Sequence, residues 1–97
     1  MPAAYVIVEM KISDPERYKE YMAAAPATIA AAGGEYLVRG GKSENFEGDW
    51  QPARLAVLKF PSYEQAKSWY DSDGYRVAMA IRQSASTGSL IIVEGAP

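Results

Sequence analysis

The chain has 97 residues, of which 48% are hydrophobic, and its ten basic and twelve acidic side chains give a net charge of −2. This length predicts one domain over residues 1–97, and the hydrophobic content excludes intrinsic disorder. Charges of both signs are interspersed, so nothing indicates binding to nucleic acid or to an anionic membrane. No apolar run approaches the ~20 residues that span a bilayer, and no basic-then-apolar leader opens the chain, so we expect a cytoplasmic protein.

Two absent residue types narrow the possible chemistry further. The chain contains no cysteine and no histidine. Disulfides, thiolate nucleophiles, zinc sites and Ser-His-Asp triads are therefore excluded within the chain. Any chemistry must use carboxylates, tyrosines, lysines, arginines or a bound cofactor; we expect no metal and assign no cofactor.

The first half of the sequence predicts a strand, a helix and a second strand. Residues 4–12 alternate and are rich in β-branched side chains, as in a strand. Asp14 is a predicted N-cap, and apolar residues then recur at helical spacing, with Pro26 expected to kink or restart the helix. A glycine pair at 33–34 ends this helix, and residues 35–41 predict a second strand that can continue, bent, to Phe46 or Glu47. The Gly40-Gly41 pair predicts either a bulge or a close backbone approach.

The second half predicts a strand, two helical segments and a final strand. Residues 54–60 are apolar on both faces, and Ser62 with Gln65 matches a capping box for the next helix. The segment 71–74 interrupts that helix, and residues 75–85 resume a helical pattern. Thr87-Gly88 is then expected to turn the chain into a last strand over residues 89–94.

This order predicts an α+β, ferredoxin-like βαββαβ fold. Its four-stranded antiparallel sheet carries its helices on one face. The first, third and last strands are apolar on both sides, whereas a sheet face open to water should alternate more cleanly. We therefore expect the helix-free face to pack against the sheet of a second copy, as a homodimer.

An ordered set of motifs covers essentially the whole chain: Tyr5-Val-Ile-Val, Asp14-Pro with Tyr18 and Tyr21, Gly33-Gly34, Tyr36-Leu-Val-Arg-Gly-Gly41, Glu47-Gly-Asp-Trp50, Trp69-Tyr-Asp-Ser72, Tyr75 and Arg82. In this combination the chain resembles the family called domain of unknown function 1330. The resemblance implies a dimeric α/β-barrel whose structural relatives include cofactor-independent monooxygenases, isomerase-like enzymes and haem-processing proteins. The missing histidine departs from the haem-bearing members and argues against haem.

Arg39 is the leading candidate for a binding site. If it shares a strand face with Glu35 and Leu37, its guanidinium lies at the end of the sheet and can clamp a carboxylate or phenolate. The alternative is a structural ion pair with Glu9, Glu47 or Asp49, within the chain or across the dimer.

Five further side chains are candidates, each with a structural alternative. Glu9 and Glu47 are potential general bases, against a cross-interface salt bridge for Glu9 and turn chemistry for Glu47. The remaining candidates are aromatic or cationic. Trp50 can line a site or pack over a hairpin, and Tyr70 and Tyr75 can donate to a ligand or belong to the core.

Arg82 falls on the same predicted helix face as the apolar Met79. A cation there either pairs with a carboxylate or lines a pocket. Taken together, the candidates predict a homodimer that binds a small anionic or phenolic molecule in a cleft between sheet and helices. A metal-independent monooxygenase- or isomerase-like enzyme would use Glu9 or Glu47 as base and Arg39 to stabilise negative charge. The alternatives are a non-catalytic binding or regulatory module and a purely structural dimer.

Overall fold

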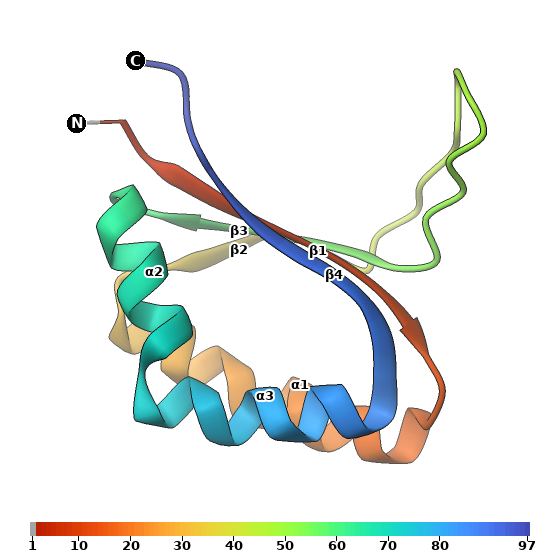
Figure 1. The fold of residues 1–97 in the computed structure, drawn as a ribbon, viewed down its shortest axis with the longest axis horizontal. Helices are drawn as coiled ribbons and strands as arrows, with labels where there is room; N and C mark the ends of the chain where they lie inside the picture. Colours follow the sequence, from red (N-terminus) through yellow and green to blue (C-terminus); the bar gives the residue numbers. More distant parts are fainter. Residues whose placement is uncertain (1) are drawn as a thin grey trace.

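The computed structural model describes residues 2–97, and its central element is a four-stranded antiparallel sheet in the order β2-β3-β1-β4 (Figure 1). The strands are β1 (Ala4–Ile12), β2 (Glu35–Arg39), β3 (Leu55–Phe60) and β4 (Ser86–Glu94). The helices are α1 (Pro15–Ala31), α2 (Tyr63–Asp71) and α3 (Asp73–Ala85), and all three cover one face of the sheet. The predicted ferredoxin-like architecture is therefore confirmed.

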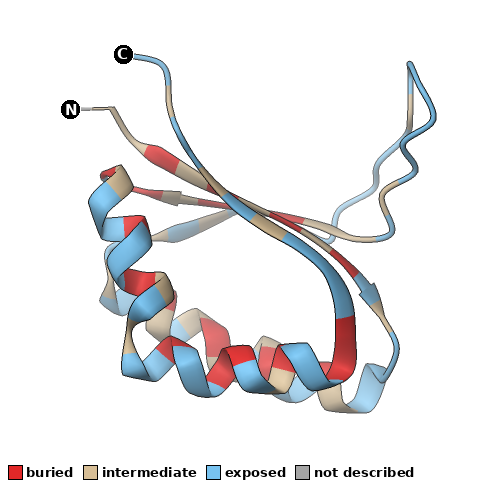
Figure 2. Cartoon of the chain, viewed as in Figure 1, coloured by how far each residue is buried: buried red, intermediate tan, exposed pale blue. Residues whose placement is uncertain are grey.

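The core lies between the sheet and the helices. On β1 the predicted inward face is buried at Val6, Val8 and Met10, while Tyr5 and Ile7 on the opposite face are half-buried. Figure 2 shows the same division, with buried residues on the sides of the helices and strands that face each other. The period-two alternation of β1 thus decides which face meets the helices.

The predicted helix starts are confirmed by their caps. The Asp14 carboxylate accepts a hydrogen bond from the backbone N–H of Arg17 at 3.1 Å, and the Ser62 hydroxyl accepts one from that of Gln65 at 3.2 Å. The predicted interruption at residues 71–74 is also present: Ser72 is the C-cap of α2 and the N-cap of α3. Pro26 does not restart the first helix, which continues unbroken from Pro15 to Ala31.

Two predictions about strand ends were wrong. β2 ends at Arg39 rather than continuing towards Phe46, and its register shift lies between Tyr36 and Val38 rather than at the glycine pair. Gly88 does not turn the chain; it lies within β4, opposite Met10. A Cβ added to Gly88 would lie 1.9 Å from the Glu9 carbonyl oxygen, so glycine is required by the close approach of β1.

Residues 40–54 leave the sheet between β2 and β3 on the side away from the helices (Figure 1). We call this segment the β2–β3 arm. None of the helices among residues 2–97 is both long and apolar enough to cross a membrane.

Candidate functional site

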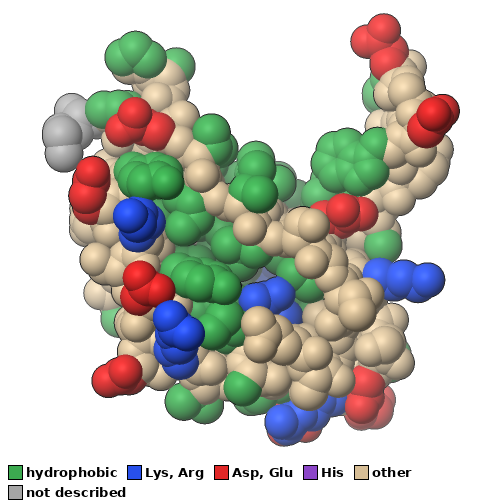
Figure 3. All heavy atoms as spheres, viewed as in Figure 1, with side chains coloured by type: hydrophobic (Ala, Val, Ile, Leu, Met, Phe, Trp, Pro, Cys, Tyr) green, Lys and Arg blue, Asp and Glu red, His purple; other side chains and the backbone are tan. Residues whose placement is uncertain are grey.

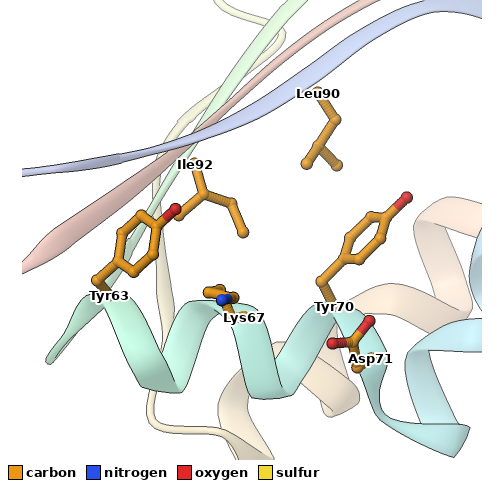
Figure 4. Close-up of a pocket in the computed structure, with 6 residues that line it drawn as sticks. All are labelled: Tyr63, Lys67, Tyr70, Asp71, Leu90 and Ile92. Atoms are coloured by element: carbon orange, nitrogen blue, oxygen red, sulfur yellow. The ribbon is translucent and has the colours of Figure 1, made fainter.

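A groove lies between helix α2 and strand β4, on the helix-covered side of the sheet (Figure 4). Its volume is about 410 Å³. Tyr63 and Tyr70 project from the helix, and Leu90 and Ile92 project from the strand, so aromatic rings face aliphatic side chains. Figure 3 shows hydrophobic side chains gathered between these two elements. Lys67 and Asp71 complete the lining.

A second hollow of about 400 Å³ shares Tyr70 and Leu90 with the first, so the two adjoin along β4. Its remaining lining residues come from the end of α3 and the start of β4: Arg82, Gln83, Ser86, Thr87 and Gly88. Together the two hollows form one elongated depression, which we call the Arg82 groove.

Arg82 is the unusual side chain of this groove. Only 6% of its surface is exposed, and none of the ion pairs formed among residues 2–97 includes it. Its Nη1 donates to the sulfur of Met10 at 3.6 Å, a weak acceptor, and its buried Nε has no hydrogen-bond partner. A buried guanidinium without a carboxylate is energetically costly, because desolvation is not offset by a counter-charge.

The helix explains how Arg82 reaches this position. It follows Tyr75, Ala78 and Met79 at the spacing of one helix face, and all of these residues are buried. It also lies in the last turn of α3, where a positive charge suits the negative end of the helix dipole. The predicted shared face with Tyr75 and Met79 is therefore confirmed. Of the two alternatives for Arg82, the structure shows the second: Arg82 lines a hollow and pairs with no carboxylate among residues 2–97.

Buried phenols lie behind the groove. The Tyr21 and Tyr75 hydroxyls are 3.0 Å apart, and Tyr75 is fully buried, so it does not reach the groove surface as Tyr70 does. Burial raises the pKa of Tyr21 far above the usual range of a phenol, and the hydrogen-bonded Tyr75 beside it adds to the rise. Burial also raises the pKa of Tyr18, although Arg54 and Arg82 oppose that rise. Tyr18 and Tyr21 therefore remain protonated at neutral pH.

Arg39 lies at the opposite edge of the sheet. Because of the register shift after Tyr36, Arg39 pairs with the inward-facing Ala56, whereas Glu35 pairs with Lys59 on the other face. The expected shared face of Glu35, Leu37 and Arg39 is therefore wrong. Arg39 stacks on the Tyr36 ring, with its guanidinium carbon 4.7 Å from the centroid.

The Arg39 guanidinium has a specific backbone partner. Its Nη2 donates to the Met22 carbonyl at 2.8 Å. In a helix that carbonyl would accept from the N–H of residue 26, but Pro26 has none. Arg39 thus replaces the helical hydrogen bond that proline removes, and among residues 2–97 it forms no ion pair with Glu9, Glu47 or Asp49.

The other candidates do not meet at the groove. Glu9 pairs with Leu55 and Ser89 on the helix-free face of the sheet, and Glu47 and Trp50 lie in the β2–β3 arm. No group of three or more potential metal ligands forms within the described residues 2–97. Of the predicted binding residues, the structure brings together Tyr70 and Arg82.

Sequence reasoning missed Tyr63, Lys67, Leu90 and Ile92 as lining residues. A signal was present for the helix, since positions 63, 67 and 70 share one helical face, adjacent to the buried face of Ala66 and Trp69. For β4, only the pairing with β1 shows which of its two apolar faces meets the helices.

The family model described as domain of unknown function (DUF1330) matches residues 3–96. A crystal structure of a protein of unknown function from Rhodopseudomonas palustris superposes with a TM-score of 0.79 at 16% identity, covering 99% of this chain and 84% of that one. SnoaB, a cofactor-independent oxygenase from Streptomyces nogalater, gives 0.66 at 9% identity, covering 100% and 96%. A conserved protein from Methanosarcina mazei Go1 gives 0.61 at 18% identity, covering 98% and 92%. Among curated protein sequences, none matches this chain.

Proposed function

The chain belongs to the family described as domain of unknown function DUF1330, and from that premise we propose that it binds a small, flat organic anion or phenol in the Arg82 groove. The observation that carries the proposal is the buried Arg82 guanidinium, which has an unpartnered Nε and no carboxylate. An oxyanion in the groove would supply the missing counter-charge and accept charge-assisted hydrogen bonds from the guanidinium.

The shape and lining of the groove support a flat ligand. Each of its two hollows falls within the ~300–1,000 Å³ range of small-molecule sites. The rings of Tyr63 and Tyr70 face Leu90 and Ile92, so a planar molecule between them would contact aromatic and aliphatic surfaces on its two faces. Arg82 would bind its acidic oxygen at one end.

The same arrangement can support metal-independent chemistry on such a ligand. A cation without a counter-charge stabilises negative charge that develops on a substrate oxygen, which is the main requirement for forming an enolate or phenolate. SnoaB, which shares this fold, is a cofactor-independent oxygenase. Oxygenation or isomerisation of a phenolic substrate is therefore the enzymatic form of the proposal.

A specific observation favours the non-catalytic alternative. The hollow that contains Arg82 is lined by hydroxyl, amide and apolar groups, and no carboxylate lines it. Asp71 lines the neighbouring hollow but forms an ion pair with Arg76 at 3.0 Å. Without a general base beside Arg82, a binding or regulatory module that presents the ligand unchanged is the second candidate function.

A homodimer is part of the same proposal. The helix-free face exposes Val38, Ile91 and Val93, and half-buried Ile7 and Val57 lie between them. Apolar sheet faces pack on one another about 10 Å apart, so a second copy would cover this surface. The Arg82 groove is on the other side of the sheet and stays open in such a dimer.

Thermal shift tests the binding proposal. A panel of phenols, aromatic carboxylates and flavins is added to the wild type, to Arg82→Met and to Arg17→Met, a control on α1 that lines neither hollow. A ligand at about 100 times its Kd should raise the Tm of the wild type and of Arg17→Met by roughly 10 °C. Arg82→Met should show no shift. Silence across the panel, or equal shifts in Arg82→Met, would contradict the proposal.

A further inference from the structure

The β2–β3 arm carries two large aromatic side chains with no packing of their own. Phe46 is 85% exposed and Trp50 is 58% exposed. At its two ends the arm is bonded to the sheet, through the Gly40 N–H to the Leu55 carbonyl and the Met10 N–H to the Arg54 carbonyl. Between these ends, the Asn45 side-chain amide donates to the carbonyls of Gly48 and Trp50. The Asn45 side chain therefore holds the tip of the arm in shape while Phe46 and Trp50 remain largely exposed.

The arm cannot serve the Arg82 groove of its own chain. Figure 1 shows it on the helix-free side of the sheet, whereas the groove lies between α2 and β4 on the helix side. Its aromatic residues therefore stand beside the apolar face that carries Ile91 and Val93, not beside the ligand groove.

We propose that the β2–β3 arm clasps a second copy of this chain, with Phe46 and Trp50 docked on the flank of the partner. This inference rests on the proposed homodimer and assigns it a second contact surface. The reach of the arm supports it: each limb, of roughly seven residues, can extend about 23 Å, whereas two packed sheets are about 10 Å apart. An arm of this length extends past the partner's sheet.

The size of the sheet face also favours a contribution from the arm. The whole molecule, arm included, measures 34 × 34 × 16 Å, and Figure 1 is viewed along the shortest axis, so the sheet face covers at most about 34 Å by 16 Å, or about 540 Å² in plan. A stable interface buries about 800 Å² on each partner. Two docked aromatic side chains add about 300 Å², which reduces that difference.

Sedimentation equilibrium measures the predicted contact. The double variant Phe46→Ser/Trp50→Ser should raise the dimer Kd at least about 30-fold, as expected for buried aromatic anchors. The control is Val77→Ser on α3, which removes a side chain of similar exposure, 66%, from the helix side. It should leave the Kd unchanged. Neither aromatic belongs to the buried core, so the double variant should fold normally.

The Trp50 indole N–H resonance gives an independent readout. The chain has two tryptophans, and Trp50→Ser assigns the two signals. The Trp50 signal should shift as concentration crosses the dimer Kd, while Trp69, bonded to the Thr28 hydroxyl at 3.1 Å, should not move. Wild-type-like dimerisation of the double variant, or a Trp50 signal that ignores concentration, would overturn the arm contact and leave the homodimer standing. A wild type that remains monomeric at millimolar concentration would overturn both.

Discussion

The two edge strands of the sheet, β2 and β4, each lie beside an arginine, but the two arginines have opposite environments. Arg39 at the β2 edge is exposed and forms a short hydrogen bond with the Met22 carbonyl. Arg82, beside β4, is buried, and its Nε has no partner. An exposed cation with a specific backbone bond serves the fold, whereas a buried cation with an unpartnered Nε and no carboxylate is better explained by a ligand. The two roles are therefore distinguished by whether the guanidinium still has an unused hydrogen-bond donor, and not by how exposed it is.

The largest predicted difference in folding stability is between two glycine substitutions, one in β4 and one in the β2–β3 arm. In Gly88→Ala the new Cβ would overlap the Glu9 carbonyl oxygen, so β4 must move away from β1, at a cost of about 3 kcal/mol. In Gly41→Ala, within the arm, the Cβ meets no atom within 4 Å, and stability should change by less than about 0.5 kcal/mol. Urea unfolding measures both. Equal losses would show that Gly88 is not packed against β1 as described.

Removing each guanidinium should change stability in opposite directions. Arg39→Met leaves the Met22 carbonyl without its donor and should cost about 1–2 kcal/mol. Arg82→Met replaces an unpaired buried charge with an apolar side chain of similar length, so unliganded stability should stay level or rise by about 1 kcal/mol. Urea unfolding of the two variants measures both changes in the free energy of unfolding. A large loss for Arg82→Met would assign that residue to the fold.

A double-mutant cycle sharpens the role of Arg39. Pro26→Ala restores a backbone N–H that can donate to the Met22 carbonyl. In that background Arg39→Met should become nearly neutral, giving a coupling energy of about 1 kcal/mol. Additive effects of the two substitutions would contradict the proposed replacement of the missing helical bond.

The smallest predicted effect is a loss of folding stability at alkaline pH. It arises from the buried Tyr21. The folded-state pKa of Tyr21 is raised above its unfolded value near 10, so the unfolded chain loses its proton first. The stabilisation is complete below that pH and should fall by about 1 kcal/mol between pH 10 and 11. Tyr21→Phe should flatten this part of the profile, and an unchanged slope would show that Tyr21 does not cause it.

Sequence reasoning recovered the elements whose signals are local. Asp14 and Ser62 were recognised as caps because a cap depends on residues within one helical turn. The β2 register shift and the place of Gly88 were missed because both depend on a neighbouring strand. The two candidate arginines differ in the same way. Helical spacing predicts the face on which Arg82 lies, whereas the face of Arg39 depends on the register shift between Tyr36 and Val38, which the sequence does not indicate.

The central claim is that Arg82, and not Arg39, receives the ligand, and the arginine Nε–H resonances report it directly. The wild type is titrated with a phenol or aromatic carboxylate that raises its Tm, and Arg82→Lys and Arg39→Lys assign the two signals. We predict that the Arg82 Nε–H signal shifts on saturation, since this group has no partner before binding, and that the Arg39 signal stays in place. Saturable binding that shifts Arg39, or leaves Arg82 unmoved, would contradict the claim.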